Sequence, residues 1–389
     1  FAFHDRSKFE IYCYSLTPSD CSEWRVRIEQ GVDAIKDISQ MHFSDAVNQI
    51  RADRVHILIN LNGYTKGSKN EIFALRPAPL QISLMGFCGT MGTPFMNYMI
   101  ADPTVIPPVF REYYDEKIIS MPHTFFVNDH RQSSRFILDN SKAVKRAQYG
   151  IDEDKFVFCC FNKLSKIEPE LFDTWVRILK RVPNSVLWLL RFPPVGEENI
   201  FNEARKRGLR HDQIVFSDIV PKIEHQSRCV LADLCLDTTG YNSHTTSCDM
   251  LWAGTPLVTL PGDRMASRVA ASMLTSCGLQ ELICPTLAAY EELAVSLAQD
   301  TDKLYSMRQH LERCRENCAA FDTPRWVRNM EKGLLAAWER HENGLSPGDI
   351  LVPDIDPVFE VKEEELLGFS APPPGGDDED AYADDFGGV

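Results

Sequence analysis

Residues 232–249 read Ala-Asp-Leu-Cys-Leu-Asp-Thr-Thr-Gly-Tyr-Asn-Ser-His-Thr-Thr-Ser-Cys-Asp, and Leu-Trp-Ala-Gly-Thr-Pro follows at 251–256. This pattern predicts a buried strand, a polar turn rich in Gly, Asn and Ser, and a helix that begins among hydroxyl side chains. The first amides of a helix lack partners within it and lie at the positive end of its dipole, so such a start suits an anion. His244, Thr245 and Thr246 would add side-chain donors, which makes a diphosphate the expected ligand. The alternative is that these side chains only cap the helix.

A second strand-turn-helix pattern precedes this one in the chain. The segment is Phe158-Cys-Cys-Phe-Asn-Lys-Leu-Ser-Lys-Ile-Glu-Pro169. Its strand is predicted at 156–161, its helix begins near Pro169, and its turn contains Lys163 and Lys166. Open α/β sheets bind ligands beyond the carboxyl ends of their strands, where two such turns can meet. We therefore expect Lys166 and the helix start near residue 244 to hold a leaving diphosphate between them.

The rest of the chain alternates between strand and helix patterns, which is typical of βαβ units and parallel sheets. Strands are predicted at 9–15, 55–61, 80–85, 98–102, 117–120, 156–161, 185–191, 213–216, 234–237 and 256–259. Helices are predicted at 26–30, 43–51, 170–181, 198–208 and within 302–341. A polar stretch at 127–143 would link two domains. The predicted fold is thus α/β, with an N-terminal half at 1–135 and a C-terminal half at 145–345.

Composition supports a protein of this size with two folded domains and a charged tail. The chain has 389 residues, of which 44% are hydrophobic, and a formal net charge of −15. From residue 350 onward there are twelve acidic residues and one lysine. Because such a segment buries too little apolar surface to fold, residues 346–389 are predicted to be a disordered acidic tail. A nucleic acid is not expected as a partner, since neither the acidic charge balance nor the motifs suggest one. A membrane is not expected either, since no apolar run reaches 18 residues.

The sequence gives no pattern typical of a metal site. Asp-x-Asp pairs occur at 152–154, 300–302, 354–356 and 378–380, but none follows a predicted strand. No cofactor and no metal are therefore expected. The 12 cysteines lack paired Cys-x-x-Cys spacing, which favours reduced thiols in a cytoplasmic or nuclear protein.

Several longer blocks resemble the catalytic region of glycosyltransferase family 41, the protein O-GlcNAc transferases. They are Asn60–Gly67, Leu75–Pro79, Met121–Phe126, Arg181–Pro193, Pro221–His225, His244–Thr246 and Ala266–Ser272. The resemblance runs from about Phe9 to about His341. It implies a GT-B fold, with two Rossmann-like domains facing each other across a cleft and the nucleotide sugar mainly on the C-terminal one. It also implies inverting transfer of N-acetylglucosamine from UDP-GlcNAc to Ser and Thr hydroxyls of intracellular proteins.

The resemblance assigns roles to individual residues. Lys166 matches the catalytic lysine that binds the diphosphate, Thr245 and Thr246 match phosphate contacts, and Asp249 matches the ribose ligand. The other substrate-binding positions are Lys163, Val220, Lys222, His225, His244 and Phe192, with Met85 and Gly86 in a glycine-rich loop beside the sugar. Asn62 and Tyr64 are further candidates, and His123 is either structural or part of the cleft lining. Arg228 is a lesser candidate for this site, and the alternative interpretation is a simple surface charge.

The chain also departs from the family pattern. Position 163 is Lys where animal members carry Gln, and Tyr241 stands where they have a smaller residue near the N-acyl group of the sugar. The family's first Rossmann strand and its His-Pro-Thr loop do not occur in this sequence, and its tetratricopeptide repeats are expected upstream of Phe1. Two alternatives stay open: an O-fucosyltransferase that uses GDP-fucose, and a non-catalytic remnant that binds nucleotide. Pro221–His225 and Ser243–Thr246 favour the GlcNAc branch.

Overall fold

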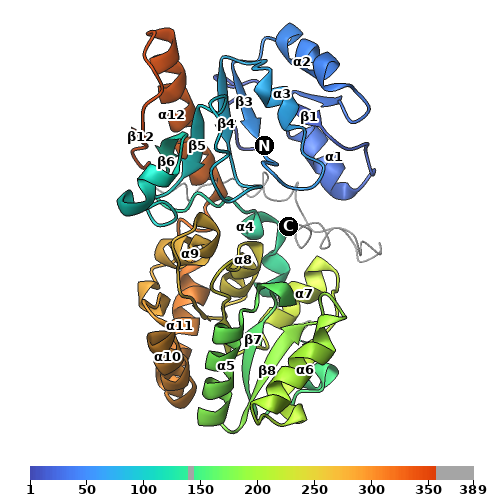
Figure 1. Cartoon of the computed structure of the whole chain (residues 1–389), viewed down its shortest axis with the longest axis vertical. Coiled ribbons are helices and arrows are strands. Elements are labelled where there is room, and N and C mark those ends of the chain that lie inside the picture. The colour runs from blue at the N-terminus through green and yellow to red at the C-terminus, as the bar shows by residue number, and fades with distance from the viewer. Residues whose placement is uncertain (139–143, 356–389) are drawn as a thin grey trace. The chain divides into compact units, whose positions relative to one another are not determined.

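The computed structural model describes residues 1–138 and 144–355, which form two compact units. One unit contains residues 1–125 and the described residues from 323 onward, and the other contains 126–322. Each is built around a five-stranded parallel sheet with helices (Figure 1). Within the described residues, no helix combines the length and the apolar character that crossing a membrane requires.

The first unit has two parallel sheets. A small one pairs β1 (Tyr12–Ser15) with β2 (Ala34–Asp37), and α1 (Glu23–Gln30) lies between them in the chain. The larger sheet has the order β12-β6-β5-β4-β3. Its strands are β3 (Ile57–Asn60), β4 (Leu80–Ser83), β5 (Tyr98–Ala101), β6 (Lys117–Ser120) and β12 (Ile350–Leu351). Its helices include α2 (Phe43–Ala52), α3 (Asn70–Ala74), η1 (Pro108–Tyr113) and α12 (Thr323–Glu342).

Helix α2 forms in this unit because its apolar residues recur every three or four positions. Ala46, Val47 and Ile50 are buried on one face of the helix. They belong to a core cluster that also contains Leu58 of β3 and Ile72 of α3. This packing fixes the amino-terminal helices beside the sheet.

The second unit has the strand order β11-β10-β7-β8-β9. Its strands are β7 (Phe156–Cys160), β8 (Ser185–Leu190), β9 (Ile214–Ser217), β10 (Leu234–Leu236) and β11 (Leu257–Val258). Its helices are α4 (His130–Ser133), α5 (Pro169–Arg181), α6 (Gly196–Lys206), α7 (Lys222–Cys229), α8 (Thr245–Trp252), α9 (Val269–Ser276), α10 (Leu287–Gln299) and α11 (Thr301–Cys314). Counted from β7, the order is that of a Rossmann sheet, and the direction of winding reverses between β7 and β10.

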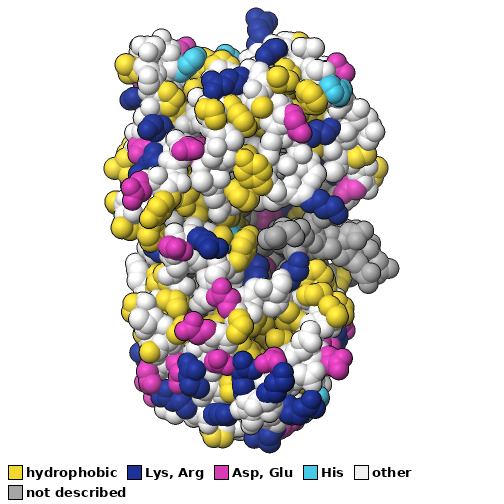
Figure 2. Space-filling model, viewed as in Figure 1, with side chains coloured by type: hydrophobic (Ala, Val, Ile, Leu, Met, Phe, Trp, Pro, Cys, Tyr) yellow, Lys and Arg dark blue, Asp and Glu magenta, His cyan; other side chains and the backbone are white. Residues whose placement is uncertain are grey.

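Burial in this unit follows the rule for parallel sheets covered on both faces. All six residues of β8 are buried. Trp175 of α5 is also fully buried, and its Nε1 donates to Tyr290 Oη of α10 at 3.4 Å. The outer surface over α5 and α6 carries mixed basic and acidic side chains (Figure 2). Arg181 pairs there with Glu291 and Glu292 of α10.

Every predicted strand occurs, within about three residues of its expected bounds. Strand β2 was not predicted, and the predicted helical segment 302–341 is two helices, α11 and α12. Helix α12 lies with the first unit, whereas the predicted C-terminal domain of 145–345 included it. The expectation of a tail without structure from residue 346 is wrong for 346–355, because β12 pairs with β6. Residues 356–389 of that tail lie outside the described residues.

Candidate functional site

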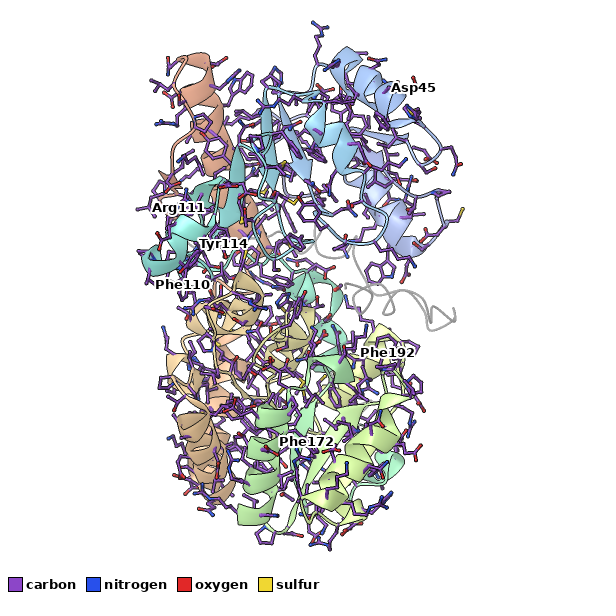
Figure 3. All side chains as sticks on the ribbon, in the orientation of Figure 1. Asp45, Phe110, Arg111, Tyr114, Phe172 and Phe192 are labelled. Carbon is purple, nitrogen blue, oxygen red and sulfur yellow. The ribbon has the colours of Figure 1, made fainter. Side chains whose placement is uncertain are left out.

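The carboxyl ends of the second unit's strands bring most of the predicted site residues to one edge of the sheet. Lys163 and Lys166 follow β7, and Phe192, labelled in Figure 3, follows β8. Val220 and Lys222 follow β9. His244, Thr245, Thr246 and Asp249 follow β10. Because β7 and β10 flank the point where winding reverses, the loops that follow these two strands border the usual ligand crevice of this sheet type.

Lys166 joins the two turns that the sequence analysis singled out. It ends a short 3-10 turn, η5 (Leu164–Lys166). Its Nζ lies 4.0 Å from the centre of the Tyr241 ring and donates to Asn242 O at 3.5 Å. The turn after β7 and the turn after β10 therefore meet at this ammonium group. Lys163 points elsewhere, with Nζ 5.5 Å from the ring centre of Phe192.

Asp237 fixes the turn after β10, and the sequence analysis did not single it out. Its carboxylate is fully buried. Oδ1 accepts hydrogen bonds from the backbone amides of Thr238 at 2.9 Å and Ser243 at 2.8 Å. Asn162 Nδ2 donates to the same oxygen at 3.3 Å, and Thr259 Oγ1 donates to Oδ2 at 2.7 Å. The signal available in the sequence was an acidic residue directly after an apolar strand.

Helix α8 begins at Thr245, as predicted, directly after His244. The His244 ring stacks on Tyr241, and its Nε2 is 3.0 Å from Ala266 O. Burial and the nearby charge of Lys166 lower the pKa of His244 to about 3. The neutral ring therefore carries its one proton on Nε2 and donates it to Ala266. This differs from the prediction that the His244 side chain would be a donor for the anion.

Asp249 lies in a buried polar cluster. Its Oδ1 accepts from His130 Nε2 at 2.8 Å and from Gln226 Nε2 at 2.7 Å. Burial alone would raise the pKa of Asp249, but the hydrogen bonds from His130 and Gln226 bring it below its ordinary value. His130 comes from α4, in the stretch interpreted from the sequence only as a linker. The role of Asp249 as a ribose ligand stays a prediction.

The interpretation of Arg228 as a surface charge is wrong. Its side chain is buried, with Nη2 donating to His225 Nδ1 at 2.9 Å and Nη1 donating to Asp218 O at 2.8 Å. Burial and the charge of Arg228 lower the pKa of His225 to about 4, so the imidazole is neutral near pH 7. The spacing of three residues on α7 was the signal that could have linked Arg228 to His225.

Lys222 is the first residue of α7, which agrees with its predicted place in the first turn of a helix. Its Nζ donates to Ser133 Oγ at 3.0 Å and lies 3.6 Å from Asp129 Oδ1. Val220 is half-buried two residues earlier. The α4 segment therefore contributes contacts to both Lys222 and Asp249.

Met85 and Gly86 belong to the first unit and lie after β4. A Cβ on Gly86 would lie 1.7 Å from Leu61 O, so this loop touches the loop after β3. Met85 adopts a φ of +58°, which is uncommon for a residue with a side chain. In the neighbouring loop, Tyr64 Oη donates to Met91 O at 2.7 Å, and its ring meets Phe87 edge-on. The glycine-rich loop is thus held at several points.

Potential metal ligands do not cluster in the described part of the chain. No group of three or more His, Cys, Asp or Glu side chains there could hold an ion. Asp354, which begins one of the Asp-x-Asp pairs, bonds instead to Arg325, Asn329 and His123. This contact gives His123 a structural role. Metal independence stays a prediction.

Comparison with known proteins supplies independent information. The model of the family described as Glycosyl transferase family 41 matches residues 1–144 and 137–330. The chain is 46% identical over 361 residues to the probable UDP-N-acetylglucosamine–peptide N-acetylglucosaminyltransferase SEC of Arabidopsis thaliana, covering 92% of this chain and 37% of that protein. It is 34% identical over 449 residues to the UDP-N-acetylglucosamine–peptide N-acetylglucosaminyltransferase of Caenorhabditis elegans, covering 88% and 39%. The chain therefore spans less than half the length of these relatives.

Two solved structures resemble this one. A mutant of the Thermobaculum terrenum O-GlcNAc transferase superposes with a TM-score of 0.71 at 28% identity, covering 88% of this chain and 62% of that chain. The Anabaena protein Alr3699/HepE, in complex with UDP and glucose, gives a TM-score of 0.56 at 11% identity, covering 84% and 91%. The second likeness concerns the fold alone. Together they confirm the predicted α/β fold class of GT-B type.

Proposed function

The chain belongs to glycosyltransferase family 41, and from this membership we propose that it transfers N-acetylglucosamine from UDP-GlcNAc to Ser and Thr hydroxyls of proteins. The observation that carries the proposal is the meeting of Lys166 with the turn before α8 at the point where the sheet reverses. A cation and a helix start in one place suit the diphosphate of a nucleotide sugar.

The proposed reaction is a displacement at the anomeric carbon. The acceptor oxygen forms a bond to that carbon and loses its proton, while the bond to the β-phosphate oxygen breaks and leaves its electron pair on UDP. Negative charge therefore grows on the diphosphate in the transition state. Lys166 and the first amides of α8 would stabilise this charge, and preorganised groups of this kind are a major source of catalysis.

The other residues of the second unit would hold the nucleoside. His225, which is neutral and held by Arg228, is assigned to the nucleoside from its match to the family. We assign the uracil edge to the backbone of Val220, the ribose to Asp249, and further contacts to Lys163, Lys222 and Phe192.

Two further properties are part of the proposal. The donor is bound without a metal ion, since Lys166 and the α8 start supply the positive charge. The protein works in the cytoplasm or the nucleus, and the 12 cysteines, all free thiols, support a reducing compartment. Its partners are UDP-GlcNAc and proteins with accessible Ser or Thr residues.

The direct test is transfer to a peptide. The chain is incubated with UDP-GlcNAc and a Ser-containing peptide, and mass spectrometry looks for the addition of one N-acetylhexosamine. The same peptide with Ala in place of Ser is the control and should stay unmodified. Transfer from GDP-fucose instead of UDP-GlcNAc would contradict the choice of donor, and no transfer from either donor by the full-length protein would contradict the assignment as an enzyme.

A further inference from the structure

The Asp237 carboxylate accepts more hydrogen bonds than most carboxylates of the second unit. Four donors converge on it: the amides of Thr238 and Ser243, the side-chain amide of Asn162, and the hydroxyl of Thr259. The two backbone donors are the first and the sixth residues after the aspartate. The carboxylate therefore closes the loop 238–243 into a ring whose ends lie against β10.

This loop is also the part of the chain that holds Lys166. Asn242 accepts a hydrogen bond from Lys166 Nζ, and the Tyr241 ring lies 4.0 Å from the same ammonium group. Thr238 Oγ1 donates to Tyr241 O at 2.7 Å, which fixes the backbone beneath the ring. The contacts run without a gap from Asp237 through the loop to Lys166.

We propose that Asp237 is a positioning residue that holds Lys166 in place for the donor diphosphate through the loop from Thr238 to Ser243. The inference rests on the proposed function, because it takes UDP-GlcNAc as the ligand of Lys166. Asp237 itself lies behind the loop, fully buried, and its effect on Lys166 passes through the loop.

The charge of Asp237 matters to this role. Burial raises the pKa of Asp237 to about 6, although its hydrogen bonds and the charge of Lys166 oppose the rise. The carboxylate is thus ionised above pH 7 and largely protonated at pH 5. Hydrogen bonds to an ionised acceptor are roughly twice as strong as neutral ones. Protonation therefore weakens the closure of the loop and removes the negative charge near Lys166.

The other titratable groups that face Asp237 keep their charge over this range. Burial raises the pKa of Cys160 and of Tyr290 well above their ordinary values. The pKa of Cys235 is also well above its ordinary value, because of its hydrogen bond to Cys159 and its burial. His244, with a pKa of about 3, is neutral throughout. Among the groups that face it, Asp237 is therefore the one whose charge changes between pH 5 and 8. A second carboxylate, Glu168, contacts the outer side of the loop, where its Oε2 accepts from Thr239 Oγ1 at 2.7 Å.

The experiment measures the Kd of the 389-residue chain for UDP-GlcNAc by calorimetry from pH 5 to 8. UDP-GlcNAc is used rather than UDP because a terminal phosphate itself titrates near pH 6. If only the ionised form holds the loop, the wild-type affinity falls about tenfold from pH 7.5 to pH 5. Asp237→Asn, which cannot titrate, should bind weakly and equally at both values. Lys166→Met should also remove the pH dependence, which a merely structural role of Asp237 would not predict.

Asp233→Asn is the matched control. Asp233 lies directly before β10, whereas Asp237 lies directly after it. Asp233 accepts hydrogen bonds from Val157 N and from Arg146 at the opposite edge of the sheet. This variant should keep the wild-type affinity and the wild-type pH profile. Should Asp237→Asn not fold, the wild-type and Lys166→Met profiles decide the question.

The outcomes separate the two proposals. Wild-type binding that is equal from pH 5 to 8 would overturn the positioning role and leave the proposed function intact. A pH dependence that persists in Asp237→Asn or in Lys166→Met would do the same. Absence of UDP-GlcNAc binding by the wild type at pH 7.5 contradicts the proposed function, and the positioning role falls with it.

Discussion

Lys166 is the single side chain on which the proposed chemistry depends most. Its Nζ lies within 3.5 Å of Asn242 O, in the turn before α8. Replacing Lys166 with Met removes the charge but keeps a side chain of similar length. Turnover should fall on the order of 10²–10³-fold, since that is the usual effect of losing one stabilising contact to a developing anion. The thermal midpoint should change little.

The control for this prediction is Lys180→Met. Lys180 lies exposed in the last turn of α5, and the other end of that helix follows the η5 turn. It should keep wild-type turnover. A Lys166→Met enzyme that retains more than about a third of the wild-type rate would remove this residue from the mechanism.

His225 links the site to the pH dependence of stability. Its pKa is about 4 in the fold and 6.5 in a model peptide, so the unfolded chain binds more protons between these values. The stabilisation is present above pH 6.5 and is lost as the pH falls toward 4. Between pH 7 and pH 5 this amounts to about 2 kcal/mol. Between pH 7 and pH 5 the wild type should lose about 2 kcal/mol more unfolding free energy than His225→Gln. Urea unfolding at the two pH values measures this difference.

A histidine on the surface of the same unit provides the comparison. His211 is exposed, and His211→Gln controls for the replacement of a histidine by glutamine outside the site. Asp237 works in the opposite direction, because a raised carboxyl pKa favours the fold at low pH. The prediction therefore compares each variant with the wild type in the pH dependence of the unfolding free energy. An equal pH dependence in His225→Gln and the wild type would contradict it.

Single residues differ in how well the surrounding sequence predicts their place and role. The place of Lys166 in a turn between a strand and a helix could be predicted from the flanking patterns, whereas its role, which the family resemblance implies, stays a prediction. The importance of Asp237 could not be predicted, because its four hydrogen-bond donors come from three loops that only the folded sheet brings together. Arg228 was misjudged because burial of a guanidinium depends on tertiary packing, here on the Phe161 ring, which lies 4.8 Å away after β7.

Strands and helices could be predicted wherever the local pattern is strong. Strand β8, Ser-Val-Leu-Trp-Leu-Leu, is an unbroken buried run, and Pro169 marks the start of α5. Strand β2 is half-exposed and only four residues long, so its pattern is weak. Strand β12 lies in a segment with an acidic composition, and its pairing with β6 joins residues more than 200 positions apart. Such non-local pairing leaves no periodic trace in the sequence.

The loops after β3 and β4 provide a test at the level of elements. Gly86 has no room for a side chain, since a Cβ there would lie 1.7 Å from Leu61 O and 3.2 Å from Asn62 Cα. Gly86→Ala must push the two loops apart. We expect a loss of about 1–3 kcal/mol in the unfolding free energy of this unit, as for other overpacked sites, and weaker donor binding if Met85 and Gly86 contact the sugar.

Gly89→Ala is the control within the same loop. A Cβ on Gly89 would meet only the Phe87 ring, with Cε1 at 3.3 Å, and that side chain can shift slightly. Its effect on stability should be well below that of Gly86→Ala in thermal or urea unfolding. Equal effects of the two substitutions would show that the close approach of the two loops does not determine the stability of this part of the unit.

For the whole molecule, the location of the nucleotide-binding set in one unit predicts how ligand affects unfolding. Lys166, Val220, Lys222, His225, Thr245 and Asp249 all lie within residues 126–322. UDP at a hundred times its Kd should stabilise that unit by roughly 2–3 kcal/mol through mass action. Calorimetry with UDP and with GDP in parallel measures this shift. A larger shift with GDP would favour the alternative donor, GDP-fucose.

The charge balance of the site also predicts how the whole enzyme responds to metal removal. Many enzymes use a divalent cation to neutralise a diphosphate, and the cation requires carboxylate ligands near the phosphates. The carboxylates at this edge are already engaged: Asp237 accepts four hydrogen bonds, and Asp249 accepts from His130 and Gln226. Lys166 and the amides at the start of α8 supply positive charge instead. Turnover and UDP-GlcNAc affinity in excess chelator should therefore equal those with magnesium or manganese. A loss in chelator that either ion restores would mean that the diphosphate recruits a cation, and Lys166 would then have to act beside a metal rather than in its place.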